Sequence, residues 1–320
     1  MRSLLVVVSL VLAVPIARAD IADIVLPPGF SIGVYAEVPN ARSLALGDNG
    51  TVFVGNRRQQ AVYAVVPEDG LQPEVIKLLD DLDSPNGIAF FEGDLYVAEV
   101  SRVTRYADIE SNLDKVPVAE VLDIDLPDKR HHGWRYIGFG PDGKLYINIG
   151  APCNVCEEDG FAEIVRMNPD GSERETFARG IRNSVGFTWH PETGELWFTD
   201  NGRDMMGDNL PPGELNHAPV GGLHFGFPFC HGGEILDPEF GAGRDCEEYA
   251  APAQKLGPHV APLGVKFYTG EKFPQEYRGQ VFIAEHGSWN RSEKIGYRVM
   301  LVRLDDGRPV SYEPFAYGWL

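Results

Sequence analysis

The sequence predicts an all-β fold of the β-propeller type, with about five blades present. One unit recurs along the chain: an apolar strand, a turn rich in Gly, Asp and Pro, and a second strand that ends in small or acidic residues. The clearest copies begin at Ala41, Pro85, Gly133, Asn183 and Ala261. The 36 Gly and 24 Pro favour turns over long helices, and helical periodicity is nearly absent. Repeated units of four short strands are typical of a propeller.

An aromatic residue marks the second strand of each unit, at Phe53, Tyr96, Tyr146, Trp197 and Phe282. The first spacings are 43, 50 and 51 residues, and the last is 85 because an insertion lies between Gly202 and Pro258. A third strand follows most of these hairpins. A preceding strand is also predicted for several units, as in "FSIGVYAEV" at residues 30–38. We therefore expect residues 20–320 to form one propeller domain.

The fifth unit is followed by "EPFAYGWL", where a sixth unit would begin. A propeller closes its ring so that no long strand edge is left unpaired. The chain therefore forms either a five-bladed ring or a ring of the six-bladed type whose sixth blade is incomplete or missing. We favour the second interpretation because of the family resemblance described below.

Residues 1–19 read as a secretory signal peptide. One Arg precedes an apolar run from Leu4 to Ile16, and Ala17-Arg18-Ala19 provides small residues at the cleavage site. The alternatives are an apolar buried strand or a membrane anchor, but the run is shorter than the ~20 residues that span a bilayer. We expect a secreted, periplasmic protein with no membrane span after cleavage.

Charge and cysteine content agree with this location. The net charge of −19 makes nucleic acid an unfavourable partner. Four cysteines are present, and local disulfides within the pairs Cys153/Cys156 and Cys230/Cys246 are the simplest interpretation in an oxidising compartment. A CxxC pair is also found in redox and metal sites, but zinc usually needs two more close ligands. Haem attachment would need His at position 157, which is Glu.

Three stretches, "HHGWRYIGFGPDGKLYINIG" (131–150), "GIRNSVGF" (180–187) and "FIAEHGSWNR" (282–291), resemble the glucose/sorbosone dehydrogenase family. The resemblance is closest to the sorbosone dehydrogenase-like branch and extends from about Leu26 to Leu320. It implies a secreted six-bladed propeller that uses pyrroloquinoline quinone (PQQ) and Ca²⁺. Family members continue into a further blade with basic residues that hold the quinone carboxylates, and we expect this chain to lack that blade.

The resemblance assigns chemistry to residues near the third and fourth units. His132 matches the family's catalytic base, since an imidazole takes the alcohol proton as a hydride leaves the same carbon. Arg182 and Asn183 match the pair beside the quinone oxygen, where a guanidinium stabilises developing negative charge. His131 stands where the glucose enzymes carry an acid. The alternatives are a packing pair of histidines and an arginine tied to a carboxylate between blades.

The polar stretch from Thr199 to Pro219 is the predicted calcium loop. Hard cations prefer oxygen ligands. Side-chain oxygens come from Asp200, Asp204, Asp208, Glu214 and Asn216. The resemblance implies that the carbonyl groups of Gly202 and Arg203 bind the ion. The alternative is a solvated polar loop.

A last group of candidates follows the fifth unit, in "AEHGSWNRSEK". His286, Arg291 and Lys294 are candidates for binding the acidic groups of the cofactor, and Trp289 for stacking on a ring. Weaker candidates at equivalent positions are Arg57 and Glu99. Three further histidines lie in or near the insertion, where a structural role is equally consistent: His224, His231 and His259.

The leading hypothesis is a PQQ- and Ca²⁺-dependent dehydrogenase that oxidises a sugar, a sugar aldehyde or a related alcohol and passes electrons to a separate acceptor, a cytochrome or a quinone. A metal-dependent lactonase of the gluconolactonase type is the rival, with an axial metal fed by Glu99, Asn148, Asn183 and Asp200. A third alternative is a non-catalytic propeller, either a binding module or a fragment.

Overall fold

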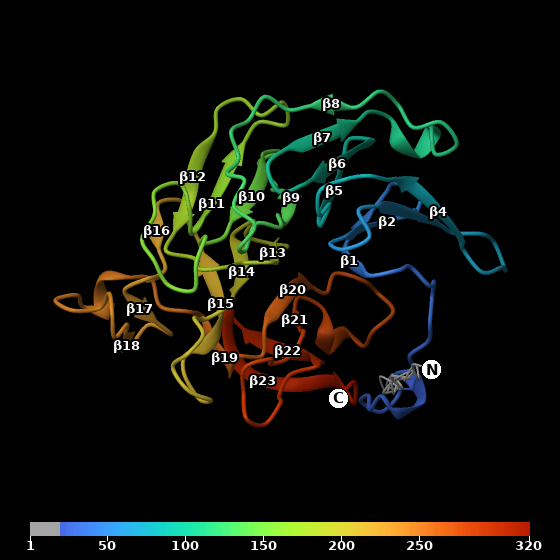
Figure 1. Ribbon diagram of the computed structural model, residues 1–320. Coiled ribbons are helices and arrows are strands. Elements are labelled where there is room, and N and C mark those ends of the chain that lie inside the picture. The colour runs from blue at the N-terminus through green and yellow to red at the C-terminus, as the bar shows by residue number, and fades with distance from the viewer. Residues whose placement is uncertain (1–19) are drawn as a thin grey trace, which may run out of the picture.

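The computed structural model describes residues 20–320, and these residues form β-sheets arranged radially around a central axis (Figure 1). Five sheets of four or five strands are present, and the remaining sheet is a small two-stranded hairpin. This confirms the predicted all-β propeller fold with five blades. The predicted signal peptide, residues 1–19, lies outside the described residues.

The first three blades follow one another along the chain. The first contains β1 (Ala41–Leu46), β2 (Val52–Asn56), β3 (Val62–Val66) and β4 (Glu74–Leu79). The second contains β5 (Gly87–Phe91), β6 (Asp94–Ala98), β7 (Val103–Tyr106) and β8 (Glu120–Val121). The third contains β9 (Ile137–Phe139), β10 (Leu145–Ile149), β11 (Glu163–Met167) and β12 (Glu175–Arg179).

The fourth blade carries the insertion. It contains β13 (Phe187–Trp189), β14 (Leu196–Asp200), β15 (Pro212–Ala218) and β19 (Gln254–Pro258). Between β15 and β19 lie β16 (Leu223–His224), which pairs in parallel with β12 of the third blade, and the hairpin of β17 (Cys230–His231) and β18 (Ile235–Leu236). The fifth blade contains β20 (Pro262–Phe267), β21 (Val281–Glu285), β22 (Arg298–Asp305) and β23 (Arg308–Tyr317). Among residues 20–320, helical structure is limited to short 3-10 turns at Ile21–Asp23, Ile109–Ser111, Cys246–Glu248 and Gln275–Tyr277.

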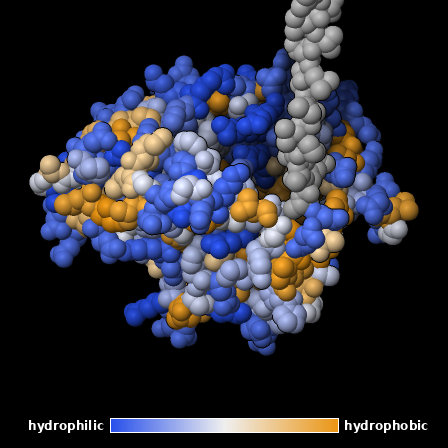
Figure 2. Space-filling view, turned by 60° about the horizontal axis from the view of Figure 1, so that its bottom comes forward, coloured by the Kyte–Doolittle hydropathy of each residue, from blue (hydrophilic) through white to orange (hydrophobic). Residues whose placement is uncertain are grey.

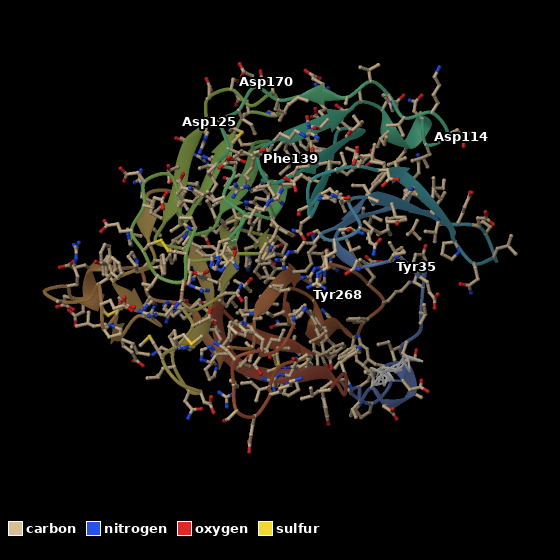
Figure 3. The ribbon with its side chains drawn as sticks, viewed as in Figure 1. Tyr35, Asp114, Asp125, Phe139, Asp170 and Tyr268 are labelled. Atoms are coloured by element: carbon tan, nitrogen blue, oxygen red, sulfur yellow. A yellow bond between two sulfur atoms is a disulfide. The ribbon has the colours of Figure 1, made fainter. Side chains whose placement is uncertain are left out.

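The repeated aromatic residues pack between neighbouring blades. Trp197 of β14 is almost completely buried, stacks on His217 and meets the ring of Phe267 from β20 edge-on. Phe139 lies between the second and third blades (Figure 3) and stacks on Phe91 with 4.1 Å between ring centroids. Aromatic packing of this kind removes apolar surface from water and fixes the angle between adjacent sheets.

The ring is open on one side, between the first and fifth blades (Figure 1). Within residues 20–320, β1 pairs only with β2, and a groove of about 680 Å³ separates β1 from β20. Leu44 and Leu46 of β1 are 61% and 68% exposed. The groove on the open side is lined mainly by apolar residues of the first and fifth blades.

The strand predicted for residues 30–38 is wrong. These residues run alongside the open side as irregular chain, with Tyr35 exposed (Figure 3), and none of them belongs to a strand. The segment is instead attached at its start, where the backbone of Val25 bridges to Tyr317 at the end of β23.

Both predicted disulfides are confirmed: Cys153 is bonded to Cys156, and Cys230 to Cys246. On the face that Figure 2 shows, apolar residues form separate patches within a largely hydrophilic surface. Among residues 20–320, no helix has the length and apolar character that crossing a membrane requires.

Replacing the aromatic side chain between the fourth and fifth blades tests this packing. Trp197→Ala should lower the free energy of unfolding by about 3–5 kcal/mol, because truncating a buried Trp leaves a cavity. Trp197→Phe should lose less than about 1.5 kcal/mol, since the indole N–H has no partner in the described structure and most of the ring volume is kept. Urea denaturation followed by near-UV circular dichroism measures both. Equal losses would show that the ring does not join the blades.

Candidate active site

One end of the propeller axis holds a cavity of about 250 Å³. Its walls are formed by the segments that precede the first strand of a blade or follow the second strand. Residues that are far apart in sequence therefore lie together here. Of the predicted site residues, seven line it: His132, Arg182, Asn183, Gly202, Asp204, His286 and Trp289.

His132 lies in the turn before β9 and is held in one orientation. Its Nδ1 lies 2.8 Å from the carbonyl oxygen of Ala151, and the amide of Ala151 donates to the carbonyl of Arg182. Since a carbonyl can only accept, Nδ1 carries the proton and Nε2 keeps its lone pair. Burial, assisted by the charges of Arg182 and His131, lowers the pKa of His132 to about 2. The free protein therefore holds a neutral imidazole with a vacant acceptor nitrogen.

Arg182 is only 4% exposed, and its guanidinium is held by a clamp that includes the small disulfide loop. Nε donates to the carbonyl of Asn154 over 2.8 Å, and Nη2 donates to Oδ1 of Asn154 over 2.9 Å. Nη2 also lies 3.1 Å from Asp204, and Nη1 donates to the carbonyl of Asn201 over 3.2 Å. A buried guanidinium needs such partners, and they fix its plane.

Asp200, at the end of β14, holds the backbone beneath this clamp. Its two carboxylate oxygens accept the amide N–H groups of Arg182 and Asn183 over 2.8 and 2.7 Å. Burial, and then the nearby charge of Glu214, raise the pKa of Asp200. The side-chain Oδ1 of Asn183 is buried, belongs to a residue that lines the cavity, and has no hydrogen-bond partner in the described structure. An acceptor of this kind is available to a donor or a cation.

The predicted calcium residues do not form one cluster. Gly202 and Asp204 line the cavity, but the carboxylate of Asp204 already accepts from Arg182 and from Nδ2 of Asn290, the latter over 2.7 Å. Glu214 and Asn216 are buried within the fourth blade, where Nδ2 of Asn216 donates to Glu214 over 3.0 Å. Within residues 20–320, no group of three or more His, Cys, Asp or Glu side chains is arranged to hold a metal ion.

Arg203 turns its side chain away from the cavity into the insertion. It donates to Asp237 over 2.6 Å and to Glu239 over 2.8 Å, and Asp237 also lies 2.9 Å from Nε2 of His231. Burial opposes ionisation of Asp237, but hydrogen bonds from His231 and Arg203 outweigh it and lower its pKa to about 2. The insertion therefore anchors the backbone of Gly202 and Arg203 from behind.

Three predicted residues lie at the outer rim instead of in the cavity wall. Arg291 directs its guanidinium at the carbonyl of Asp208 and at Oδ1 of Asn209, and Asp208 accepts from Ser292. Lys294 is exposed and does not line the cavity. In this structure Arg291, Lys294 and Asp208 do not line the cavity, and contacts within the rim loops engage the side chains of Arg291 and Asp208.

His131 is exposed beside His132 and does not line the cavity, whereas His259 does. The ring of His224 stacks on that of Phe229, and His231 contacts Asp237, the residue that binds Arg203.

The residues required by the lactonase alternative do not converge. Glu99 is buried against Arg102 and the amide of Asp83, and Oδ1 of Asn148 accepts from the amide of Tyr136. Of the four candidates, only Asn183 lines the cavity.

Sequence reasoning missed Asn154, Arg42 and Trp134, and it ranked Arg57 low. Arg42, Arg57 and Trp134 line the cavity, and Asn154 holds Arg182. The available signal for Asn154 was its place inside the Cys153–Cys156 loop, next to the predicted third-unit site.

Fold and cavity together define a propeller with a buried, basic axial site built around an oriented histidine and a fixed arginine. The family model for glucose/sorbosone dehydrogenase matches residues 98–290, and the chain belongs to this family. An uncharacterized protein of Borreliella burgdorferi is 30% identical over 335 residues, which covers 99% of this chain and 87% of that protein.

Solved structures share the fold at lower identity. An enzyme of carbohydrate-active enzyme family AA12 from Trichoderma reesei superposes with a TM-score of 0.81 at 20% identity, covering 92% of this chain and 87% of that chain. The PQQ domain of pyranose dehydrogenase from Coprinopsis cinerea, in its holo form, superposes with a TM-score of 0.77 at 17% identity. The match covers 94% of this chain and 87% of that chain. The PQQ-bound aldose sugar dehydrogenase from Streptomyces coelicolor superposes with a TM-score of 0.64 at 19% identity, and the match covers 91% of this chain and 84% of that chain.

The anchor of Arg203 offers a matched pair of tests. Asp237→Ala should lower the free energy of unfolding by about 3–5 kcal/mol, because it leaves a buried guanidinium without its partner. Glu239→Gln should lose less than about 1 kcal/mol, since Glu239 is 60% exposed. Urea denaturation of both variants measures the difference, and similar losses would contradict the assignment of Asp237 as the anchor.

The depressed pKa of His132 predicts a pH-dependent contribution to stability. Below the unfolded-state pKa of 6.5, the unfolded chain binds a proton that the folded protein excludes, so stability falls as the pH drops. Relative to His132→Gln, the wild type should lose about 1 kcal/mol between pH 6.5 and 5.5. Urea denaturation at the two pH values tests this. A constant difference between the two proteins would show that His132 titrates normally.

Proposed function

We propose that this protein is a quinoprotein dehydrogenase that oxidises a sugar, or a sugar aldehyde, by hydride transfer to PQQ in the presence of Ca²⁺. Family membership supports an oxidoreductase acting on sugars. Structural relatives that carry PQQ in their names support the cofactor, and a calcium structure of the Trichoderma reesei enzyme supports the ion.

The residues of the cavity fit an anionic, oxygen-rich ligand. Arg42, Arg57 and Arg182 line it, and the buried Oδ1 of Asn183 lacks a partner in the described residues. Arg182 and Asn183 would hold PQQ from the fourth blade. The backbone of Gly202 and Arg203, fixed from behind by Asp237, would offer carbonyl oxygens to Ca²⁺.

The single observation that carries the proposal is the orientation of His132. Its Nδ1–H is committed to Ala151, so Nε2 is the atom that accepts the proton of a substrate hydroxyl. When the hydroxyl loses this proton and the carbon that bears the hydroxyl loses a hydride, the alcohol becomes a carbonyl, which is a two-electron oxidation. Bound PQQ would supply the acceptor for the hydride, and Ca²⁺ would act as a Lewis acid upon it.

Arg182 has a complementary task. Its guanidinium is already fixed by Asn154, Asn201 and Asp204, so little reorganisation is needed when negative charge develops beside it. Around His132, positive neighbours disfavour the imidazolium in the free protein. An anionic ligand in the same cavity would offset that repulsion and raise the pKa of His132 toward the range of a working base.

We further propose secretion to the periplasm and a separate electron acceptor, a cytochrome or a quinone. The apolar N-terminal stretch that ends in Ala17-Arg18-Ala19 and the two disulfides support the location. The acceptor follows from the chemistry, because a reduced cofactor must be reoxidised between turnovers.

PQQ titration with and without Ca²⁺, followed by addition of candidate sugars, tests the function. The wild type should bind PQQ more tightly with Ca²⁺ and should reduce a dye with aldose. His132→Gln should keep PQQ binding but lose about 10²–10⁴-fold in kcat, because the proton acceptor is gone.

Trp197→Phe, remote from the cavity, serves as the matched control and should keep its activity. A folded wild type that binds no PQQ would overturn the dehydrogenase function and favour a non-catalytic propeller. Full activity of His132→Gln would overturn the role of His132.

A further inference from the structure

The first blade contributes two guanidinium groups to the cavity, and the function above assigns no contact to either of them. Arg42 lies in β1 and Arg57 follows β2, and both line the cavity. Within residues 20–320, neither side chain forms an ion pair with a carboxylate. Burial lowers the pKa of both groups, and the only charged groups that add to this shift are other arginines. By contrast, Arg182 on the opposite wall is fully engaged.

Arg57 is held in place by an aromatic ring and not by an acid. Its Cζ lies 3.6 Å from the centroid of the Trp134 ring. The same ring approaches His132 edge-on, with 6.1 Å between centroids. Stacking fixes the plane of the guanidinium and leaves its N–H edges free for a planar, bidentate acceptor. These free edges therefore lie close to the predicted base.

Arg42 and Arg57 also lie close enough to repel each other. Burial, and then Arg42 and Arg58, lower the pKa of Arg57. Burial, and then Arg42 and Arg57, lower the pKa of His286, which lines the same wall. Like charges brought together in a partly buried site are unfavourable unless an anion joins them. The chain has a net charge of −19, yet no acidic side chain pairs with Arg42 or Arg57 on this wall within the described residues.

We propose that Arg42 and Arg57 form a carboxylate-binding subsite beside His132. A carboxylate has the planar, two-oxygen geometry that a guanidinium fork binds best. The inference deepens the proposed function and rests on it for the substrate class: the carboxylate is the acid group of a sugar acid such as an aldonate, bound as substrate beside His132. The subsite itself requires only the free protein.

The first experiment uses the wild type without PQQ and two matched sugars, gluconate and glucose. Gluconate should bind in isothermal titration calorimetry and raise the melting temperature, whereas neutral glucose at the same concentration should do neither. Arg42→Gln and Arg57→Gln should each weaken gluconate binding about tenfold, the value expected for one charge-assisted contact.

Two further variants control for charge and folding. Arg308→Gln removes an exposed arginine of β23, outside the cavity, and should leave gluconate binding unchanged. Arg57→Lys keeps the charge but loses the planar fork, so its gluconate affinity should stay below that of the wild type. Because losing an uncompensated charge removes repulsion, Arg57→Gln should melt no lower than Arg308→Gln without ligand.

A second arm identifies the source of the carboxylate. If the subsite holds an acid of PQQ, loading the protein with PQQ should abolish gluconate binding, and Arg57→Gln should weaken PQQ binding about tenfold. If it holds an acidic substrate, gluconate should still bind to the PQQ-loaded protein, and Arg57→Gln should raise KM for acidic sugars without changing PQQ affinity. Gluconate binding to the PQQ-loaded protein supports the substrate subsite, whereas its abolition by PQQ overturns it.

The subsite is overturned if the wild type does not bind gluconate, or if Arg42→Gln and Arg57→Gln bind it as tightly as Arg308→Gln does. These results are separate from the test of the proposed function. A wild type that binds gluconate through Arg57 but does not bind PQQ would retain the subsite and lose the dehydrogenase.

Discussion

The buried guanidinium of Arg182 is the charge around which the axial site is assembled. Its partners come from the disulfide loop of the third blade, through Asn154, and from the end of β14, through Asn201 and Asp204. Asp204 in turn accepts from Asn290, which lies between β21 and β22 of the fifth blade. Burying a guanidinium without partners is costly, so these loops must adopt one arrangement for the charge to be satisfied. One ion thus joins segments of three blades.

The apolar interior of the blades sets the frame for this network but does not determine its details. Second-strand aromatics such as Trp197 and Tyr146 pack toward a neighbouring blade and fix how far apart the loops begin. Buried apolar contact is strong but has little directionality. The hydrogen bonds of Asp200, which hold the amides of Arg182 and Asn183, supply the direction. Frame and site therefore depend on different interactions.

The sequence predicted the blades well because a repeating pattern of strands and turns is a local signal. The first-strand and second-strand ends follow from that pattern, whereas the family resemblance pointed to His132, Arg182 and Gly202. Residues 30–38 also alternate like a strand, but pairing depends on a partner edge, which is not a local property. Arg291 was misplaced for a similar reason: its direction is set by Asp208, more than 80 residues away in sequence.

The two walls of the cavity show why Arg57 was ranked low and yet carries information. A sequence gives the charge of an arginine but not whether an acid neutralises it. On the fourth-blade wall, Asp204 neutralises Arg182, and that arginine acts as a fixed part of the frame. On the first-blade wall, Arg57 is oriented by the uncharged ring of Trp134, so its orientation is fixed while its charge remains available.

The arginines of this cavity contrast with the net charge of the protein, which is −19. Positive charge gathered in one cavity attracts anions there, whereas the negative charge of the remaining surface repels them. Burial, and then the nearby positive charges, lower the pKa of His132 and keep it neutral, so an anion in the cavity would favour protonation of this base.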